Sequence, residues 1–178
     1  RNEDSNYDET FWNILHTENK NDAILLALTK KLDFQVCLSM RNKISVNNNP
    51  VSVSPDLQQN DTKVQTSFSK YISQGDEFIL EKYVGVCSSL NYPKEDLVEN
   101  AVLQSKNAKL KGYETLRAEH INFWTEKWKA CDIVISGDVA AQQAIRFNIF
   151  QLNQTYTGDD ARLNVGPKGF TGEKYGGT

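Results

Sequence analysis

The hydrophobic pattern of this 178-residue chain changes its period at Pro93. Before that residue, apolar side chains alternate with polar ones, which is typical of strands. After it, apolar side chains recur every three or four residues, as they do along one face of a helix. The sequence therefore predicts an α+β chain in which a sheet region precedes a helical region.

The residues before Pro93 predict several short strands joined by turns. The clearest alternation covers residues 34–41 and has one apolar and one mixed face. Residues 1–19 are polar and acidic, and their acidic group is expected at the surface, while the pairs at 11–12 and 14–15 are the first apolar anchors. Residues 47–62 are expected to form a surface loop or a weak strand. The other predicted strands are residues 23–28, 43–46, 64–68 and 78–87. Such a series predicts part of an antiparallel β-sandwich, with apolar faces or strand edges left uncovered.

The residues after Pro93 predict three helices, at 93–107, 110–131 and 139–157, the last capped by Asp138. The second helix has a broad aromatic face, which more often packs against a neighbouring domain than binds a ligand. His120 lies on that face and is interpreted as a core or interface residue. The third helix is apolar over so much of its circumference that we expect it to be buried between layers.

Two polar residues, Arg146 and Asn148, interrupt the apolar third helix. They could form a satisfied buried pair or a contact near a helix end. They could equally help to shape a binding pocket. The sequence leaves these two interpretations open.

The last stretch, residues 158–178, carries six of the ten glycines. Such a stretch is either a binding surface or a flexible tail, and the aromatic residues within it favour a binding surface. It matches neither a phosphate-binding P-loop nor the GxGxxG pattern. Its amides, cations and aromatic rings suit a polyol. The candidate substrate-binding residues are Lys168, Phe170, Thr171, Glu173, Lys174, Tyr175, Gly176 and Gly177.

Three segments resemble glycoside hydrolase family 65, in particular its maltose phosphorylase branch. They are Ala144–Leu152 (AIRFNIFQL), Asp160–Thr178 (DARLNVGPKGFTGEKYGGT) and, at the other end, Asn2–Trp12 (NEDSNYDETFW). In that family the second segment joins the first helix of the catalytic barrel to the second and lines the sugar pocket. The third segment resembles part of the family's amino-terminal domain.

The resemblance implies an α+β multidomain fragment. Residues 1–92 would be the C-terminal part of an antiparallel β-sandwich domain, and residues 93–132 a helical linker. Residues 133–178 would begin an (α/α)6 barrel with its first inner helix and a pocket-lining loop. Arg1 opens the chain without a Met or a signal-peptide pattern, which suggests an excised or processed piece. The family's general acid and phosphate-binding residues would lie beyond Thr178, so we expect this polypeptide alone to be inactive.

The resemblance also implies a reaction. The intact enzyme would cleave maltose with inorganic phosphate as co-substrate, giving β-glucose 1-phosphate and glucose with inversion. Trehalose, kojibiose, nigerose or a sugar-phosphate disaccharide would be alternative substrates within the family, and a homodimer is possible. A function of another class is a noncatalytic carbohydrate-binding or assembly module.

Composition excludes several other classes of function. A formal net charge of -3 gives no electropositive field for general nucleic-acid binding, and no apolar run reaches the length that spans a bilayer. The spacing of Cys37, Cys87 and Cys131 is unlike that of a zinc site or a disulfide scaffold, which predicts reduced core thiols. No metal or other cofactor is predicted. We expect a cytoplasmic protein.

Overall fold

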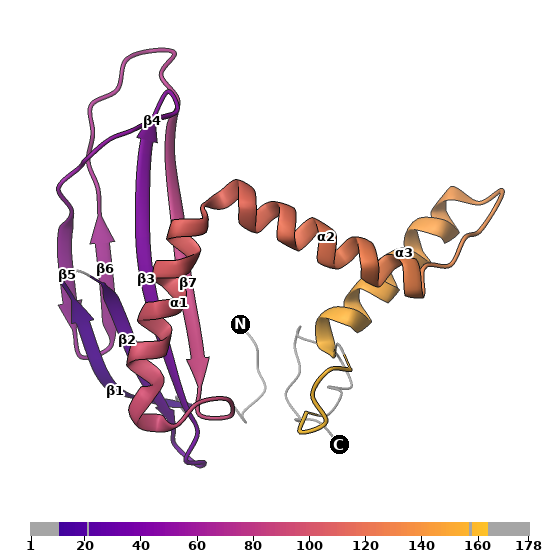
Figure 1. The fold of residues 1–178 in the computed structure, drawn as a ribbon, viewed down its shortest axis with the longest axis horizontal. Coiled ribbons are helices and arrows are strands. Elements are labelled where there is room, and N and C mark those ends of the chain that lie inside the picture. Colours follow the sequence, from indigo (N-terminus) through magenta and orange to yellow (C-terminus); the bar gives the residue numbers. More distant parts are fainter. Residues whose placement is uncertain (1–10, 21, 157, 164–178) are drawn as a thin grey trace, which may run out of the picture. The chain divides into compact units, whose positions relative to one another are not determined.

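A computed structural model describes residues 11–20, 22–156 and 158–163 (Figure 1). The chain divides into two compact units, Arg1–Arg117 and Ala118–Thr178. The first unit contains the strands and the first helix, and the second contains most of α2 and all of α3. The order predicted from the change of period is confirmed, because the last strand ends at Ser88 and the first helical turn begins at Lys94.

The first unit is built on a five-stranded antiparallel sheet with β3 (Gln35–Val46) at its centre. Strand β2 (Ala23–Thr29) pairs with the first half of β3 on one side, and β1 (Trp12–Asn19) pairs with β2. On the other side, β7 (Phe78–Ser88) pairs with β3 along its whole length. The short β4 (Asn49–Pro50) folds back onto the end of β3.

Strand β3 is longer than predicted and ends in a hairpin to β4. Asn47 and Asn48 form its turn and have φ angles of 50° and 63°, a conformation that Asn adopts more easily than most residues. The predicted separate strands at 34–41 and 43–46 are wrong, because β3 runs through both of them. The long partner β7 holds β3 continuous across the polar residues that interrupt its pattern.

Two strands lie where the sequence carries little signal. Strand β1 falls within residues 1–19, where no strand was predicted, and its register shifts between Ile14 and His16, which breaks the simple alternation. Strand β5 (Asp56–Asn60) lies within the expected loop and pairs with β6 (Lys63–Ser67). All five residues of β5 are exposed and only Leu57 is apolar, so no alternation of apolar and polar side chains marks it as a strand.

Helix α1 (Leu97–Lys111) follows the 3₁₀ turn η2 (Lys94–Asp96) and packs across β3 and β7. Beneath it lies Gly85 of β7, where a Cβ atom would stand 2.2 Å from the carbonyl oxygen of Ala101 and 2.8 Å from the backbone nitrogen of Ser105. The helix can approach the strand this closely only because the strand residue has no side chain.

The core of the first unit lies under α1 and combines apolar and small polar residues. It is formed by Ile24, Cys37, Cys87, Leu97 and Ala101. Beside it, the buried hydroxyls of Ser39 and Ser105 share a hydrogen bond of 2.9 Å, which joins β3 to the helix. The mixed face of residues 34–41 is therefore the face that the helix covers.

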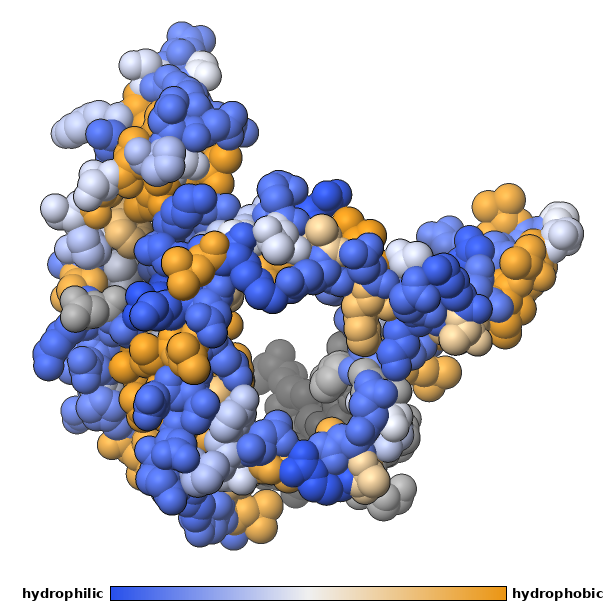
Figure 2. All heavy atoms as spheres, viewed as in Figure 1, coloured by the Kyte–Doolittle hydropathy of each residue, from blue (hydrophilic) through white to orange (hydrophobic). Residues whose placement is uncertain are grey.

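The apolar face of the same strands is only partly covered. Leu38 lies opposite Val86 and Met40 opposite Val84 across β3 and β7. Leu38, Val84 and Val86 are 37%, 42% and 54% exposed, and Figure 2 shows apolar atoms at this unit's surface. Partial covering of the sheet was expected from the sequence.

The hairpin β5–β6 forms a small second layer against β1 and β2. The buried amide of Asn19 fixes it: Nδ2 donates to the carbonyl oxygens of Gln58 at 3.1 Å and Gln65 at 2.7 Å. Its Oδ1 accepts from the hydroxyl of Thr66 at 3.3 Å. The antiparallel sheets of the expected sandwich are thus present.

Two of the three cysteines lie inside the first unit. Cys37 and Cys87 face each other across β3 and β7, are 0% and 1% exposed, and carry free thiols. Burial, together with the neighbouring Cys87 thiol, raises the pKa of Cys37 to about 11, and burial also raises the pKa of Cys87. The expectation of core thiols is confirmed for this pair, whereas Cys131 is only partly buried and is not a core residue.

These positions predict a strong difference in thiol reactivity. At pH 8 and without denaturant, iodoacetamide should modify Cys131 at least ~100-fold faster than Cys37 or Cys87, because the thiolate is the nucleophile and the core must open first. Peptide mass mapping over time measures the three rates. In 6 M guanidinium chloride they should become similar. Equal rates in the native protein would show that the core around α1 is not closed.

The second unit is a pair of helices joined by aromatic contacts. Helices α2 (Tyr113–Cys131) and α3 (Val139–Thr155) meet where the rings of Trp124 and Phe150 are 5.1 Å apart. The rings of Trp124 and Trp128 are 6.3 Å apart. The aromatic face predicted on α2 therefore packs, at least in part, against α3.

Helix α3 begins as predicted, but the predicted burial of this helix is wrong in this chain. Asp138 caps it by accepting from the backbone N–H of Ala141 at 2.9 Å. Only Ile149 is buried, whereas Val139, Phe147 and Leu152 are 85%, 60% and 66% exposed. One neighbouring helix covers one stripe, and the described residues supply no second layer for the others.

Candidate functional site

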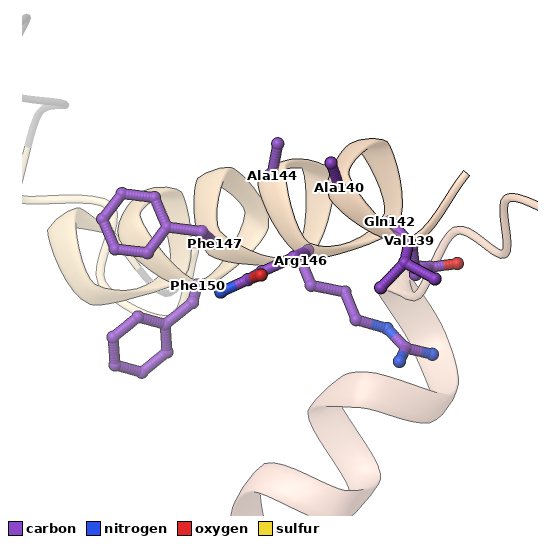
Figure 3. Close-up of a pocket in the computed structure, with 8 residues that line it drawn as sticks. Val139, Ala140, Gln142, Ala144, Arg146, Phe147 and Phe150 are labelled. Atoms are coloured by element: carbon purple, nitrogen blue, oxygen red, sulfur yellow. The ribbon is translucent and has the colours of Figure 1, made fainter.

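An open hollow of about 790 Å³ runs along α3 in the second unit (Figure 3). It lies on the first two thirds of the helix and is mainly apolar, with one guanidinium group beside it. Its lining residues are Val139, Ala140, Gln142, Gln143, Ala144, Arg146, Phe147 and Phe150. A hollow made by one helix face is a surface for packing, since a small-molecule site has polar groups converging from several elements.

The Arg146 guanidinium is held by Asp132, which lies just after α2. Nε donates to Oδ1 at 2.9 Å and Nη2 to Oδ2 at 2.6 Å, a bidentate geometry. The hydrogen bonds and charge of Arg146 hold the pKa of Asp132 below its usual range, and Asp132 in turn raises the pKa of Arg146. Both side chains are partly exposed.

This pair bears on the two interpretations of Arg146 and Asn148. Arg146 makes a contact that fixes the link between α2 and α3, which is the structural role, although the pair is not buried as that interpretation supposed. Asn148 is exposed. The sequence offered no signal for Asp132 as the partner, because the two residues stand 14 positions apart and belong to no shared periodic face.

A second ion pair stabilises the turn that follows α3. Arg162 donates to the Asp160 carboxylate through Nε at 2.8 Å and Nη2 at 2.6 Å, and this pairing lowers the pKa of Asp160 to about 2. The hydroxyl of Tyr156 donates to the backbone carbonyl of Asp160 at 3.3 Å. Gly158, with φ of +83°, allows the chain to turn there. The start of the glycine-rich stretch is therefore held in a defined turn.

The predicted substrate-binding residues lie outside the described residues. They are Lys168, Phe170, Thr171, Glu173, Lys174, Tyr175, Gly176 and Gly177. Their roles stay predictions. The structure describes the elements that precede them in the chain, namely α3, the Arg146–Asp132 pair and the turn at Asp160.

Neither histidine lies in a catalytic arrangement within the described part of the chain. His120 packs edge-on against Trp124 with ring centroids 6.3 Å apart, but it is exposed and is therefore not a core residue. Its interpretation as an interface residue stays a prediction. His16 lies 3.6 Å from Glu18 at the surface.

In residues 11–20, 22–156 and 158–163, no three His, Cys, Asp or Glu side chains gather as a metal site would require. None of the helices described is long and apolar enough to cross a membrane.

Comparison with known proteins matches two parts of one family. Residues 1–127 match the glycosyl hydrolase family 65 N-terminal domain, and residues 146–178 match the glycosyl hydrolase family 65 central catalytic domain. The second match begins inside α3, at Arg146, and covers the whole of the predicted substrate-binding stretch.

Individual relatives give the same result. The chain is 38% identical to a maltose phosphorylase of Bacillus subtilis over 99% of its own length and 23% of that protein. It is 33% identical to an alpha,alpha-trehalose phosphorylase of Thermoanaerobacter brockii over 84% of the chain and 19% of that protein. A kojibiose phosphorylase of Halothermothrix orenii is 39% identical over 46% of the chain and 10% of its own length.

The chain thus spans less than a quarter of the length of these relatives. Its sheet unit and α1 lie within the match to the N-terminal domain, and most of α3 lies within the match to the catalytic domain. On this evidence, the chain belongs to glycoside hydrolase family 65.

Proposed function

We propose that this chain is part of an inverting disaccharide phosphorylase whose substrate is maltose. The observation that carries the proposal is the 38% identity to a maltose phosphorylase along nearly the whole chain. The glycine-rich stretch supports it, since its amides, cations and aromatic rings suit a sugar. Trehalose is the second candidate, favoured by the 33% identity to a trehalose phosphorylase over 84% of the chain.

In the proposed reaction, a protonated carboxylic acid donates its proton to the glycosidic oxygen as the bond to the anomeric carbon breaks. Inorganic phosphate attacks that carbon from the opposite face, so the configuration inverts and β-glucose 1-phosphate forms. Phosphate is already anionic, so it needs no second carboxylate to activate it. Glucose is the other product.

We assign no catalytic residue to this chain. The general acid and the phosphate site would lie in the part of the enzyme that corresponds to the remaining length of the relatives, and the 178 residues alone would be inactive. The residues from Lys168 to Gly177 would line the sugar pocket. The domain layout that we propose is a sandwich over 1–92, a helical linker over 93–132 and the start of an (α/α)6 barrel over 133–178.

In the barrel that we propose, the exposed apolar residues of α3 would pack against further helices of the enzyme. Phe147 and Leu152, now 60% and 66% exposed, are suited to such packing. The Arg146–Asp132 pair would fix where the first barrel helix leaves the linker. The parent would work on small molecules in the cytoplasm, without nucleic acid or membrane. A homodimer of the parent is compatible with this proposal.

A phosphorolysis assay of the full-length parent tests the proposal. With maltose, trehalose, kojibiose and nigerose offered separately, glucose 1-phosphate should be released from maltose and only in the presence of phosphate. Release from trehalose alone would replace maltose by the second candidate, and release from none would overturn the proposal. The 178-residue chain should show no turnover.

A pair of variants of the parent tests the glycine-rich stretch. Tyr175→Ala should lower kcat/KM at least ~10-fold if its ring contacts the sugar. Tyr71→Ala is the matched control, because Tyr71 is fully exposed in the first unit and should leave kcat/KM unchanged. Equal activity of the two variants would remove Tyr175 from the proposed pocket.

A further inference from the structure

A second hollow, of about 570 Å³, lies in the first unit where the sheet meets the start of α2. Its wall is formed by the ends of β3, β4 and β7 and by the first residues of α2. Among its lining residues are Lys43, Asn48, Glu81, Tyr83, Tyr113 and Glu114. The volume falls in the range of about 300–1,000 Å³ that is usual for small-molecule sites.

The Tyr83 hydroxyl distinguishes this hollow from an ordinary surface depression. Tyr83 is only 5% exposed, and its buried oxygen has no hydrogen-bond partner of acceptable geometry. The Glu81 carboxylate and the Tyr113 backbone lie within reach of a weak hydrogen bond to it, and burial is the main cause of its raised pKa. A buried hydroxyl without a well-formed hydrogen bond is unfavourable, so a ligand that supplies one gains from it.

The charges around the hollow favour a neutral ligand. Lys43 Nζ lies 3.0 Å from the Glu81 carboxylate, so that cation is already neutralised. The lining contains one further cation, Lys82, and one further anion, Glu114. An anion would meet two carboxylates, and a cation would meet two lysines, whereas a neutral molecule meets donors and acceptors of both kinds.

The remaining groups suit a ring that carries hydroxyls. Tyr113 is 56% exposed at the mouth of the hollow, so its ring is accessible for stacking. The carboxylates of Glu81 and Glu114 can accept hydrogen bonds from hydroxyls, and the Asn48 amide can both donate and accept. An aromatic face beside such polar groups is the combination that holds a pyranose.

We propose that this hollow is a noncatalytic binding site for a neutral sugar, in which a pyranose ring stacks on Tyr113 and one sugar hydroxyl pairs with Tyr83. The site belongs entirely to the first unit and shares no residue with the glycine-rich stretch of residues 158–178. It does not depend on the proposed phosphorolysis.

An NMR titration of the ¹⁵N-labelled 178-residue chain with maltose tests the proposal. Amide shifts should saturate with a millimolar Kd and concentrate on residues that line the hollow. Tyr113→Ala should weaken binding about tenfold, and Tyr71→Ala, the exposed control, should not change it. Tyr83→Phe should weaken binding about fivefold while leaving the unfolding midpoint unchanged or higher, because it removes a buried hydroxyl without a partner.

Several results would overturn this site. They are shifts that do not saturate, shifts confined to residues 158–178, or a Kd that Tyr113→Ala leaves unchanged. Saturable shifts at the hollow with sodium phosphate but not with maltose would also overturn it. A parent enzyme that releases no glucose 1-phosphate would defeat the proposed function and leave this titration unaffected.

Discussion

Gly85→Ala should destabilise the first unit by at least about 3 kcal/mol, and Gly85→Val should prevent it from folding. An added Cβ would stand 2.2 Å from the carbonyl oxygen of Ala101 and 2.8 Å from the Ser105 backbone nitrogen. Both are backbone atoms of α1, so no side chain can rotate away. The helix would have to leave the sheet, which would break the Ser39–Ser105 hydrogen bond and open the cysteine core.

Urea unfolding followed by circular dichroism measures the Gly85→Ala effect. Val84→Ala is the matched control, because the adjacent residue points to the opposite, 42% exposed face and should change stability by less than about 1 kcal/mol. If the two variants have the same midpoint, α1 does not pack as closely on β7 as the structure shows.

Asn19→Asp should be the most disruptive polar change, costing about 3 kcal/mol at pH 7. The amide nitrogen that now donates to two backbone carbonyls, those of Gln58 and Gln65, would be replaced by a carboxylate oxygen. A buried carboxylate facing two acceptors loses both hydrogen bonds and its hydration. The hairpin β5–β6 would separate from β1 and β2.

The pH dependence separates this cause from a simple loss of contacts. The environment raises the pKa of the introduced carboxyl in the folded state above its unfolded value of about 4. The folded state then holds its proton more tightly, so the variant loses stability relative to wild type as the pH rises above about 4. The difference in unfolding midpoint should be small at pH 4 and large at pH 7.

Asn13→Asp on the same strand is the control, since Asn13 is exposed and its change should have little effect at either pH. A difference between wild type and Asn19→Asp that does not vary with pH would contradict the electrostatic explanation. It would point instead to a loss of packing at the end of β1.

Sequence reasoning succeeded where local physics decides the structure. Asp138 caps α3 because its carboxylate reaches a free backbone N–H three residues later, and that spacing is visible in the chain. Strand β7 was recognisable from its apolar run, and the helical region from Pro93 onwards. These elements are determined mainly by neighbours close in sequence.

It failed where a distant partner decides the structure. Strand β5 exists because β6 pairs with it, and its exposed, mostly polar residues carry no mark of that pairing. Gly85 and Ser105 lie 20 residues apart, and only the packed helix shows why the glycine is needed. The burial of α3 was expected from its own composition, but burial requires a second layer that these residues do not supply.

The candidate site was predicted from resemblance more than from physics. The residues from Lys168 to Gly177 rest on the family pattern, and the described structure ends short of them. The two ion pairs that precede them in the chain differ in how far the sequence reveals them. Asp160 and Arg162 are near neighbours that could have been noticed together, whereas Asp132 and Arg146 meet only through the turn between two helices.

The partly covered sheet face also affects how stability varies with temperature. Apolar side chains that are already in water in the native state, such as those of Leu38, Val84 and Val86, add little to the heat capacity gained on unfolding. The first unit should therefore have a flatter stability curve than a fully enclosed domain of the same length. Its stability would be modest at its maximum and would decline slowly on either side.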